Sequence, residues 1–387
     1  MRLVAVALLV ATTAACHRPT PPRADVATPE ACVTPATWVL PATGRTQTTP
    51  DVLARAARAR FVLLGEMHDR ADHHRWQADV IAGLLARRAD VVVGFEMFPR
   101  RTQPALDRWV AGQLDEPAFL AATDWDTVWS FDPVLYMPLF HLARLNRLPM
   151  VALNVERGLV SRVGREGWDA VPATEREGVG TPAPASPSYQ AELDAVFAAH
   201  GQAIDAAAAK HFVEAQLTWD RAIAEALVSA SQHDPGALVV GVMGSGHVER
   251  GNGVPHQLTA LGVPARDIVV LLPWDAGRAC AERTADLADA VFGIAPGDTP
   301  VAPPRLGVLL RPATGGVEVI EVTAGSTGAA AGLRTGDVIV DAAGTSVTSA
   351  GVLRAIVARV APGTWLPLRV RRGGRTRALV ARFGPTP

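Results

Sequence analysis

The chain has few lysines, cysteines and tyrosines: its 387 residues include three cysteines and two tyrosines, and Lys210 is the only lysine. A Schiff-base or phosphate-binding mechanism based on lysine therefore has a single candidate residue. The formal net charge is −1, which gives no electrostatic reason to expect nucleic acid or a strongly acidic partner. Hydrophobic residues make up 49% of the chain, enough for a sizeable core in two or three domains.

Several motifs with known chemistry are missing from the sequence. There is no CxxC pair, so a thiolate zinc site is not expected, and no CxxCH, which excludes covalent c-type haem. No P-loop or GxGxxG follows an apolar run, so nucleotide chemistry is not expected. No GxSxG elbow is present, which argues against a serine hydrolase.

The N-terminus is typical of an export signal. An apolar stretch, Leu3–Val10, follows a positive start and leads to Thr13-Ala14-Ala15-Cys16, which resembles a bacterial lipobox. We expect residues 1–16 to be a signal peptide with Cys16 lipidated; an ordinary secretory signal cleaved nearby is the alternative. Because His17 is not the Asp of an inner-membrane retention signal, we expect a lipid-anchored protein of the cell envelope, at the outer membrane.

The remaining cysteines form an even pair in an oxidising compartment. Cys32 and Cys280 are candidates for a disulfide that fastens the N-terminal segment to the main domain, and two free thiols are the alternative. Residues 17–37 are rich in Pro, Thr and Ala and are typical of a flexible tether.

Residues 38–292 alternate between short apolar runs and longer amphipathic ones. This pattern predicts an α/β fold with a mainly parallel sheet flanked by helices. The predicted strands are Phe61–Leu64, Val91–Phe95, Met150–Leu153, Leu238–Met243 and Ile268–Leu272. The predicted helices are Asp72–Arg88, Tyr136–Leu145, Tyr189–His200 and His211–Ser231. Residues 293–304 are rich in Pro and Gly and are interpreted as a linker.

Residues 305–387 are predicted to form a small β-rich domain with one helix, Ser349–Val360. The segments Leu306-Gly307-Val308, Ala331-Gly332-Leu333 and Gly336-Asp337-Val338-Ile339 resemble a PDZ domain of the bacterial, protease-associated kind. The resemblance implies that a peptide or protein C-terminus adds as a strand to the sheet edge. Its carboxylate would lie on the loop Leu306-Gly307-Val308 with help from Arg305; a module used only for packing or dimerisation is the alternative.

Polar side chains follow the predicted strands of the main domain. Glu66 and His68 come after the first, Glu96 after the second and His247 after the fourth, and this edge of an α/β sheet is where sites form. Two imidazoles and two carboxylates match a divalent metal site with a spare general base, with Arg157 as a stabiliser of negative charge. The alternative for the histidines is a structural role in satisfying backbone groups at the strand ends.

Six motifs in the main domain resemble one known family. They are LLGEMHD (63–69), GFEMF (94–98), the stretch from Trp129 to Pro138, ALNVER (152–157), AQLTWDRAIA (215–224) and GSGHV (244–248). Together they resemble the ChaN-like haem-binding lipoproteins, in the superfamily of Tiki metalloproteases and erythromycin esterases. The resemblance implies haem binding and iron uptake, with tyrosinate as the iron ligand.

We therefore take haem as the expected cofactor, with Tyr136, His68 and His247 as the candidate residues that bind it. Tyr136 as an aromatic packed on the core is an equal alternative. His73 and His74 are expected to face water or the rim of the site. The expected function is an exported haem-binding lipoprotein with a peptide-binding PDZ module.

Two other functions stay open. The chain can be a metal-dependent hydrolase, a protease or esterase, that uses the residues at the strand ends, or a non-catalytic envelope scaffold. An outer-membrane receptor and a second copy of the chain are further candidate partners, and the expected contact with the membrane is the lipid anchor alone.

Overall fold

The structure is a computed structural model in which residues 32–129, 131–199, 205–295, 304–361 and 363–384 are described. The predicted signal peptide, the lipidation site Cys16 and most of the predicted tether lie outside these residues. Within the described ranges, no helix is both long and apolar enough to cross a membrane.

The main domain is built on an eight-stranded sheet with the order β2-β1-β8-β7-β3-β6-β4-β5. Its strands are β1 (Trp38–Val39), β2 (Thr46–Gln47), β3 (Phe61–Leu64), β4 (Val91–Pro99), β5 (Met150–Asn154), β6 (Leu238–Val242), β7 (Ile268–Asp275) and β8 (Ala290–Ile294). Strands β3 to β8 pair in parallel, while β1 pairs antiparallel with β2 and β8. The predicted mainly parallel sheet is therefore confirmed.

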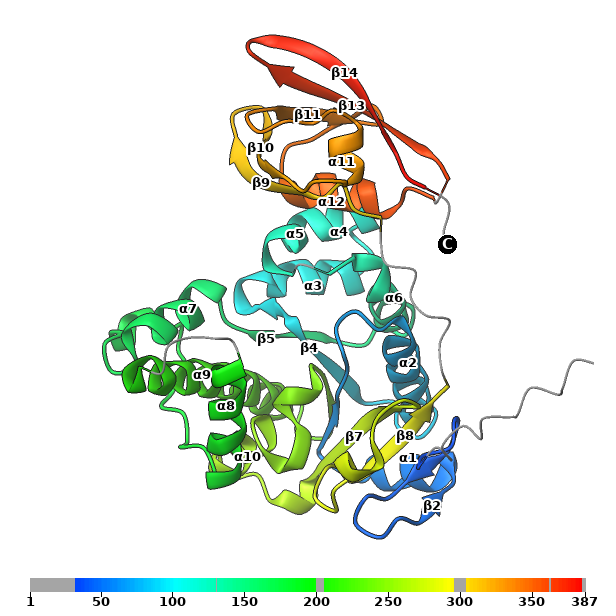
Figure 1. The fold of residues 1–387 in the computed structure, drawn as a ribbon. Coiled ribbons are helices and arrows are strands. Elements are labelled where there is room, and N and C mark those ends of the chain that lie inside the picture. Colours follow the sequence, from blue (N-terminus) through cyan, green and yellow to red (C-terminus); the bar gives the residue numbers. More distant parts are fainter. Residues whose placement is uncertain (1–31, 130, 200–204, 296–303, 362, 385–387) are drawn as a thin grey trace, which may run out of the picture. The chain divides into compact units, whose positions relative to one another are not determined.

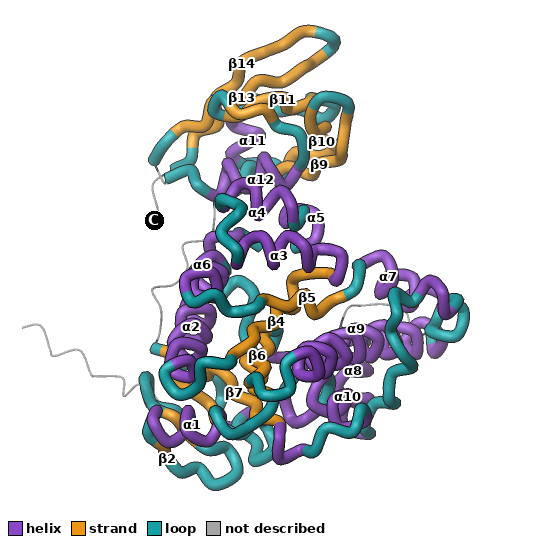
Figure 2. The backbone as a smooth tube through the Cα atoms, turned by 180° about the vertical axis from the view of Figure 1, so that it is seen from behind, coloured by secondary structure: helices purple, strands orange, loops and turns teal. Residues whose placement is uncertain are grey.

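Helices cover both faces of this sheet (Figures 1 and 2). One face carries α1 (Thr49–Ala56), α2 (Ala71–Leu85), α3 (Gln103–Val110), α4 (Glu116–Ala122), α5 (Trp125–Val128) and α6 (Met137–Leu145). The other carries α9 (Ala206–His233) and α10 (Val254–Ala260), with α7 (Arg157–Glu166) and α8 (Pro187–Ala199) packed on α9.

Strand β3 explains why the sheet needs both layers. All four of its residues are buried, with Val62 and Leu64 in the core under α2 and Phe61 and Leu63 in the core under α9. A strand buried on both faces appears in the sequence as an unbroken apolar run, because successive side chains point to opposite sides. The same holds for β6, which lies beside β3.

Most predicted elements of the main domain are present, with shifted ends. Strand β4 continues to Pro99, beyond the predicted end at Phe95, and the helix predicted from His211 begins at Ala206. The sequence pattern missed β1 and β2, which are two residues long, and β8, which pairs with β7 next to the linker.

The C-terminal domain is a separate antiparallel sheet with the order β14-β13-β11-β10-β9 and β12 paired to β11. Its elements are β9 (Val308–Ala313), β10 (Gly316–Val322), α11 (Thr327–Ala330), β11 (Val338–Ala342), β12 (Thr345–Ser346), α12 (Ala350–Ala358), β13 (Trp365–Arg372) and β14 (Arg375–Arg382). Alternate residues of β13 are buried, so one face of this hairpin closes the core and the other faces outward.

Asp337 is a buried charge that ties this small domain together. Its carboxylate is fully buried and accepts hydrogen bonds from Arg372 at 2.6 and 2.7 Å and from the Arg334 N–H at 2.9 Å. Burial acts to raise the pKa of Asp337, but these donors outweigh it and lower the pKa. The hydrogen bonds to Arg372 link the turn before β11 to the end of β13.

The segment from Cys32 to Val39 is fastened along β8. The Ala36 N–H donates to the Gly293 carbonyl at 2.8 Å, and the Gly293 N–H donates to the Thr37 carbonyl at 2.9 Å. A side chain at Gly293 would lie 2.2 Å from the Thr34 carbonyl, so this close approach requires glycine.

Cys32 and Cys280 are free thiols that lie close enough to interact. Burial and the nearby Cys280 raise the pKa of the Cys32 thiol. The predicted disulfide therefore stays a prediction, and the contact between the two side chains supports it.

We predict that oxidised glutathione converts these two thiols into one intramolecular disulfide. In a Cys16→Ser background, thiol titration should fall from two groups to none, and intact mass should drop by two hydrogens. The bond closes a long loop, so thermal or urea unfolding should show about 2–4 kcal/mol of added stability. Cys280→Ser serves as the control that cannot form it. Two thiols that remain open to alkylation after oxidation would contradict the prediction.

Candidate functional site

The predicted site residues meet at one edge of the main sheet. Strand β6 pairs with both β3 and β4, so the ends of these three strands are adjacent. Glu66 follows β3, and His247 lies in a short 3-10 helix after β6. Glu96 lies inside β4 and not past its end, because β4 continues to pair with β5 up to Pro99. Its side chain still reaches the site.

Glu66 is the centre of the first group of side chains. One carboxylate oxygen lies 2.5 Å from His68 Nδ1 and accepts a hydrogen bond from the Tyr136 hydroxyl at 3.3 Å. The other oxygen lies 3.4 Å from His74 Nε2, close enough for charge interaction but without hydrogen-bond geometry. Because the side chain of Glu66 is fully buried, these neighbours replace its lost hydration.

The charge state of Glu66 follows from this setting. Burial acts to raise its pKa, but the hydrogen bond with His68 and the close contacts and charges of His68 and His74 outweigh burial and lower the pKa to about 2. The same contact affects His68: burial acts to lower the pKa of its imidazole, and Glu66 and Glu96 raise it. Glu66 therefore stays ionised and holds His68 in a fixed orientation.

His247 is the centre of the second group. Its Nδ1 lies 2.6 Å from Asp220 of α9 and its Nε2 lies 3.4 Å from Glu96. The other oxygen of Glu96 accepts a hydrogen bond from the Gly244 N–H at 2.7 Å, and Asp220 accepts one from the Tyr189 hydroxyl at 2.9 Å. Burial acts to lower the pKa of His247, but the two carboxylates raise it well above its ordinary value. His247 is thus a buried cation between two carboxylates.

Gly244 explains how the two groups come so close. A side chain on Gly244 would lie 3.0 Å from His68 Cε1 and 3.7 Å from the Glu96 carboxylate. The missing side chain lets the backbone after β6 pass beside the His68 ring while its N–H binds Glu96. The glycine at the start of the GSGHV motif is therefore a packing requirement of the site.

Each of the two groups contacts a tryptophan that lines a cavity of about 230 Å³. The Trp129 ring packs edge-on against His68, with centroids 4.8 Å apart, and the Trp219 ring against His247, with centroids 5.6 Å apart. Both indoles line the cavity, as does Arg157 at the start of α7. Arg157 is exposed there, so the structure places it beside the two groups and not among them.

The structure corrects other expectations from the sequence. His73 and His74 do not face water: both are buried, and His73 accepts a hydrogen bond from the Met67 N–H at 3.0 Å and contacts Asp275 at 3.1 Å. Tyr136 is also fully buried, and burial together with the charge of Glu66 raises the pKa of its phenol. Tyr189 is likewise buried, and burial and Asp220 raise its pKa.

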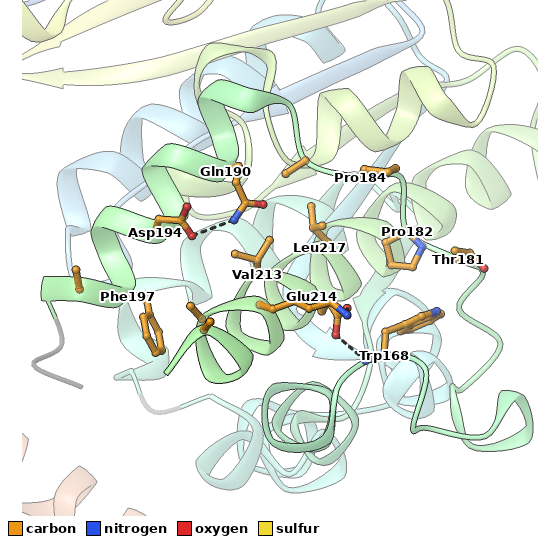
Figure 3. Close-up of a pocket in the computed structure, with 15 residues that line it drawn as sticks. Trp168, Thr181, Pro182, Pro184, Gln190, Asp194, Phe197, Val213, Glu214 and Leu217 are labelled. Carbon is orange, nitrogen blue, oxygen red and sulfur yellow. Dashed lines mark hydrogen bonds and ion pairs between the residues drawn. The ribbon is translucent and has the colours of Figure 1, made fainter. Parts of the chain in front are cut away.

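A larger cavity of about 730 Å³ lies away from these residues, between α8, α9 and the loop before α8 (Figure 3). Its walls are mainly apolar and include Trp168, Phe197, Val213 and Leu217. No histidine, cysteine or tyrosine is among its described lining residues. It therefore offers none of these iron ligands and is not the site that the sequence motifs predict.

The predicted metal site is not supported. Among the residues that the structure describes, no group of three or more His, Cys, Asp or Glu is arranged to hold a metal ion. The geometry explains this: His68 and Glu66 face one another at 2.5 Å, and both nitrogens of His247 are directed at carboxylates. The side chains thus bind one another and do not converge on a shared point.

The predicted peptide site lies at one edge of the C-terminal sheet. Strand β9 is an edge strand, and Arg305 before it is exposed. Gly307 has a φ of +69°, and the Leu306 and Gly307 carbonyls accept hydrogen bonds from Gly328 and Thr323. These bonds fix the loop Leu306-Gly307-Val308 at the start of the open edge.

Sequence reasoning missed Asp220 and His74, which hold His247 and Glu66. Asp220 lies in the AQLTWDRAIA motif, on the otherwise mainly apolar buried side of α9. An acidic residue on a buried helix face needs a buried partner for its charge. The histidine after the fourth predicted strand, His247, was a candidate for that partner. His74 carries no such signal, because its neighbours in the sequence are polar.

We predict that acid unfolds the protein partly through Glu66. Its pKa of about 2 in the folded state, against 4.5 for the free group, corresponds to about 3 kcal/mol that is present above pH 4.5 and lost as the pH falls towards 2. Urea unfolding of Glu66→Gln at several pH values should show lower stability at pH 6 and a weaker fall below pH 4.5. Asp79→Asn, an exposed carboxylate on α2, is the control, and an equal acid dependence in Glu66→Gln and the native chain would refute the prediction.

Comparison with known proteins agrees with this arrangement of strands and motifs. The family model described as haem-binding uptake, Tiki superfamily, ChaN matches residues 52–258, and a PDZ domain model matches residues 304–381. No curated protein matches the chain.

Three solved structures illustrate the similarity. ChaN of Campylobacter jejuni, solved with cofacial haem, is 19% identical with a TM-score of 0.51, and the match covers 66% of this chain and 95% of that one. A serine endoprotease from Yersinia pestis is 28% identical over 20% of this chain and 28% of its own, with a TM-score of 0.19. An erythromycin esterase, EreC, is 12% identical over 62% of this chain and 77% of its own, with a TM-score of 0.39. Since the ChaN model spans more than half of the chain, this protein belongs to the ChaN family of haem-binding uptake proteins in the Tiki superfamily, with a PDZ domain after the family domain.

Proposed function

We propose that this protein is an exported haem-binding lipoprotein that serves haem or iron acquisition at the cell envelope, with its PDZ domain binding protein C-termini. Family membership is the observation that carries the haem-binding part. The export signal and Cys16 in the sequence support the envelope location. An outer-membrane receptor and a homodimer remain predicted partners.

Haem needs an iron ligand, and the two tyrosines do not fit that role. Both phenols are buried, both donate to carboxylates, and both have raised pKa values. A tyrosinate ligand must lose its proton and reach the iron, and each of these features opposes that. This chain therefore departs from the tyrosinate ligand that its resemblance to the family implies.

His68 fits the role better. Its side chain is 31% exposed, and Glu66 occupies its Nδ1 at 2.5 Å, which leaves Nε2 as the nitrogen that can bind iron once it releases its proton. An imidazole held by a carboxylate through its other nitrogen is the usual arrangement of a metal-binding histidine. The rings of Trp129 and Phe131 pack against His68, with centroids 4.8 and 5.1 Å away, and provide apolar surface for a porphyrin.

The groups next to His68 suit the rest of the cofactor. Met67 is 55% exposed, so the chain offers a further apolar side chain directly beside His68. Arg157, exposed beside Trp129 at the small cavity, suits a haem propionate through charge and bidentate geometry. His247 is enclosed by Asp220 and Glu96, and we assign it to supporting the site and not to binding iron.

Haemin titration of the full chain is the direct test. We predict a saturable Soret shift for the native protein and for Tyr136→Phe, and at least about tenfold weaker binding for His68→Ala. Reduction with dithionite should leave the haem bound, because a neutral imidazole suits ferrous iron as well as ferric iron. His141→Ala, which removes a half-exposed imidazole paired with Glu116, is the matched control and should bind like the native protein.

The outcomes separate the two parts of the proposal. A native protein that gives no Soret shift contradicts haem binding itself. A native protein that binds haemin, with His68→Ala unchanged and Tyr136→Phe impaired, contradicts only the assignment of His68.

The PDZ domain supports a second binding activity. Strand β9 leaves backbone groups unpaired at the sheet edge, and Val308, Leu310 and Ile356 pack partly buried beside it on the core. An extended peptide that ends in an apolar residue suits this edge, with its carboxylate at the N–H groups of Gly307 and Val308. The metal-dependent hydrolase lacks a cluster of metal ligands among the described residues. An envelope scaffold would need only the peptide-binding activity of the PDZ domain.

We predict that fluorescent peptides ending in Val with a free carboxylate bind the full chain, and that the same peptides with an amidated end bind at least about tenfold more weakly. Arg305→Ala should weaken only the free-carboxylate peptide. Arg375→Ala is the control, because it removes an exposed arginine at the start of β14, the opposite edge strand. Equal binding of both peptide forms would contradict carboxylate recognition.

A further inference from the structure

Positive charge is concentrated at the C-terminal end of the chain. The 46 residues after Asp341 contain eight arginines and no acidic residue, although the whole chain has a net charge of −1. Six of these arginines lie on β13 and β14 or at their ends. These two strands form a long hairpin at one edge of the PDZ sheet (Figure 1).

The pairing of the two strands determines which side chains share the outer face. Leu366, Leu368 and Val370 of β13 are buried in the domain core, so the residues between them face outward. In the antiparallel register Trp365 lies opposite Arg382 and Pro367 opposite Val380. Residues directly opposite one another lie on the same face of a sheet.

This outer face is apolar at one end. Trp365 is 67% exposed and Val380 is 42% exposed, which is unusual for side chains of their size. The Arg382 guanidinium lies over the Trp365 ring, 5.3 Å from its centroid. An exposed indole beside arginine is a pairing that recurs at membrane–water interfaces.

Arginines lie along the whole hairpin: Arg371 and Arg382 share the outer face with Trp365, while Arg375 and Arg377, opposite Arg372 and Val370, lie on the other face near the turn. Arg372 and Arg369 are paired with Asp337 and Asp341. Across the described ranges, the remaining four arginines of the hairpin form no ion pair with a carboxylate; they are Arg371, Arg375, Arg377 and Arg382. Four cations without a carboxylate partner on one hairpin favour an anionic surface as a partner.

We propose that the β13–β14 hairpin docks on the surface of an anionic lipid bilayer, with Trp365 and Val380 at the headgroup level, Arg371 and Arg382 on lipid phosphates, and Arg375 and Arg377 adding positive charge from the turn. Lipid suits the hairpin better than nucleic acid or an acidic protein, because the exposed apolar residues adjoin the cations and need an apolar environment as well as a charged one. The PDZ peptide edge is β9, at the opposite end of the sheet order from β14. Both edges can therefore be occupied together.

This contact goes beyond the proposed haem and peptide binding, and it adds to the lipid anchor. The predicted anchor would attach the chain at Cys16, and the basic hairpin would give the PDZ domain an electrostatic contact of its own with the bilayer. It would also hold the PDZ domain against the bilayer.

Vesicle flotation with the full chain carrying Cys16→Ser, which removes the acylation site, tests the proposal. We expect binding to vesicles of phosphatidylglycerol and phosphatidylcholine, little binding to pure phosphatidylcholine, and release at high salt. Replacement of the four arginines by alanine should weaken binding at least about 100-fold, since each arginine near such a surface contributes about fivefold. Trp365→Ala should weaken binding too, and it should abolish the blue shift of tryptophan fluorescence that vesicles cause.

Two control variants keep the result interpretable. Replacing Arg45, Arg58, Arg87 and Arg108, four exposed arginines of the main domain, changes the net charge equally and should leave binding intact. Replacing the four hairpin arginines by lysine instead of alanine should leave most of the vesicle binding intact. Equal loss in both alanine sets, binding that ignores lipid charge, or tighter binding to a DNA duplex than to the vesicles at the same salt would overturn the proposal.

Discussion

The site depends on the pairing of buried carboxylates with imidazoles. A carboxylate buried without partners would take up a proton, and an imidazole buried alone would lose one. Here Glu66 keeps its charge because His68 and His74 lie beside it, and His247 keeps its charge because it lies between Glu96 and Asp220. The imidazole rings of His68 and His247 are therefore each held in one orientation by a charged carboxylate. The indoles of Trp129 and Trp219 pack on these two rings.

The sheet makes this pairing possible by bringing distant segments to one edge. Glu66, Glu96 and His247 come from three separate parts of the chain, and the order β3-β6-β4 places them together. The apolar strands enforce the order, because β3 and β6 are buried on both faces and can lie only between two helical layers. Gly244 then allows the final approach of backbone to His68. The strength of the local charge interactions is a consequence of the hydrophobic core around them.

Sequence reasoning predicted the fold and the location of the site better than the state of each side chain. Apolar runs such as Phe61–Leu64 carry their own signature, so the parallel sheet was predictable, and the motifs after the strands marked the site edge. Burial at the site was not predictable in the same way. His74 lies in polar sequence and Tyr136 was open to either role, and only the packing of α2 against α6 shows that both are enclosed. Asp220 lies far along the chain from its partner His247, so their pairing depends on tertiary structure.

The environment of each side chain, rather than its sequence motif, also decides which residue can bind the haem iron. A tyrosine motif in the sequence suggests a tyrosinate, but a phenol that is buried and donates to a carboxylate is stabilised in its protonated form. Glu66 thus has opposite effects on its two neighbours: its charge keeps the Tyr136 proton in place, and its hydrogen bond orients the His68 ring with Nε2 free. One carboxylate therefore disfavours the ligand that the motif suggests and prepares the imidazole two residues away. In this chain the choice of iron ligand follows from where the negative charge of Glu66 lies.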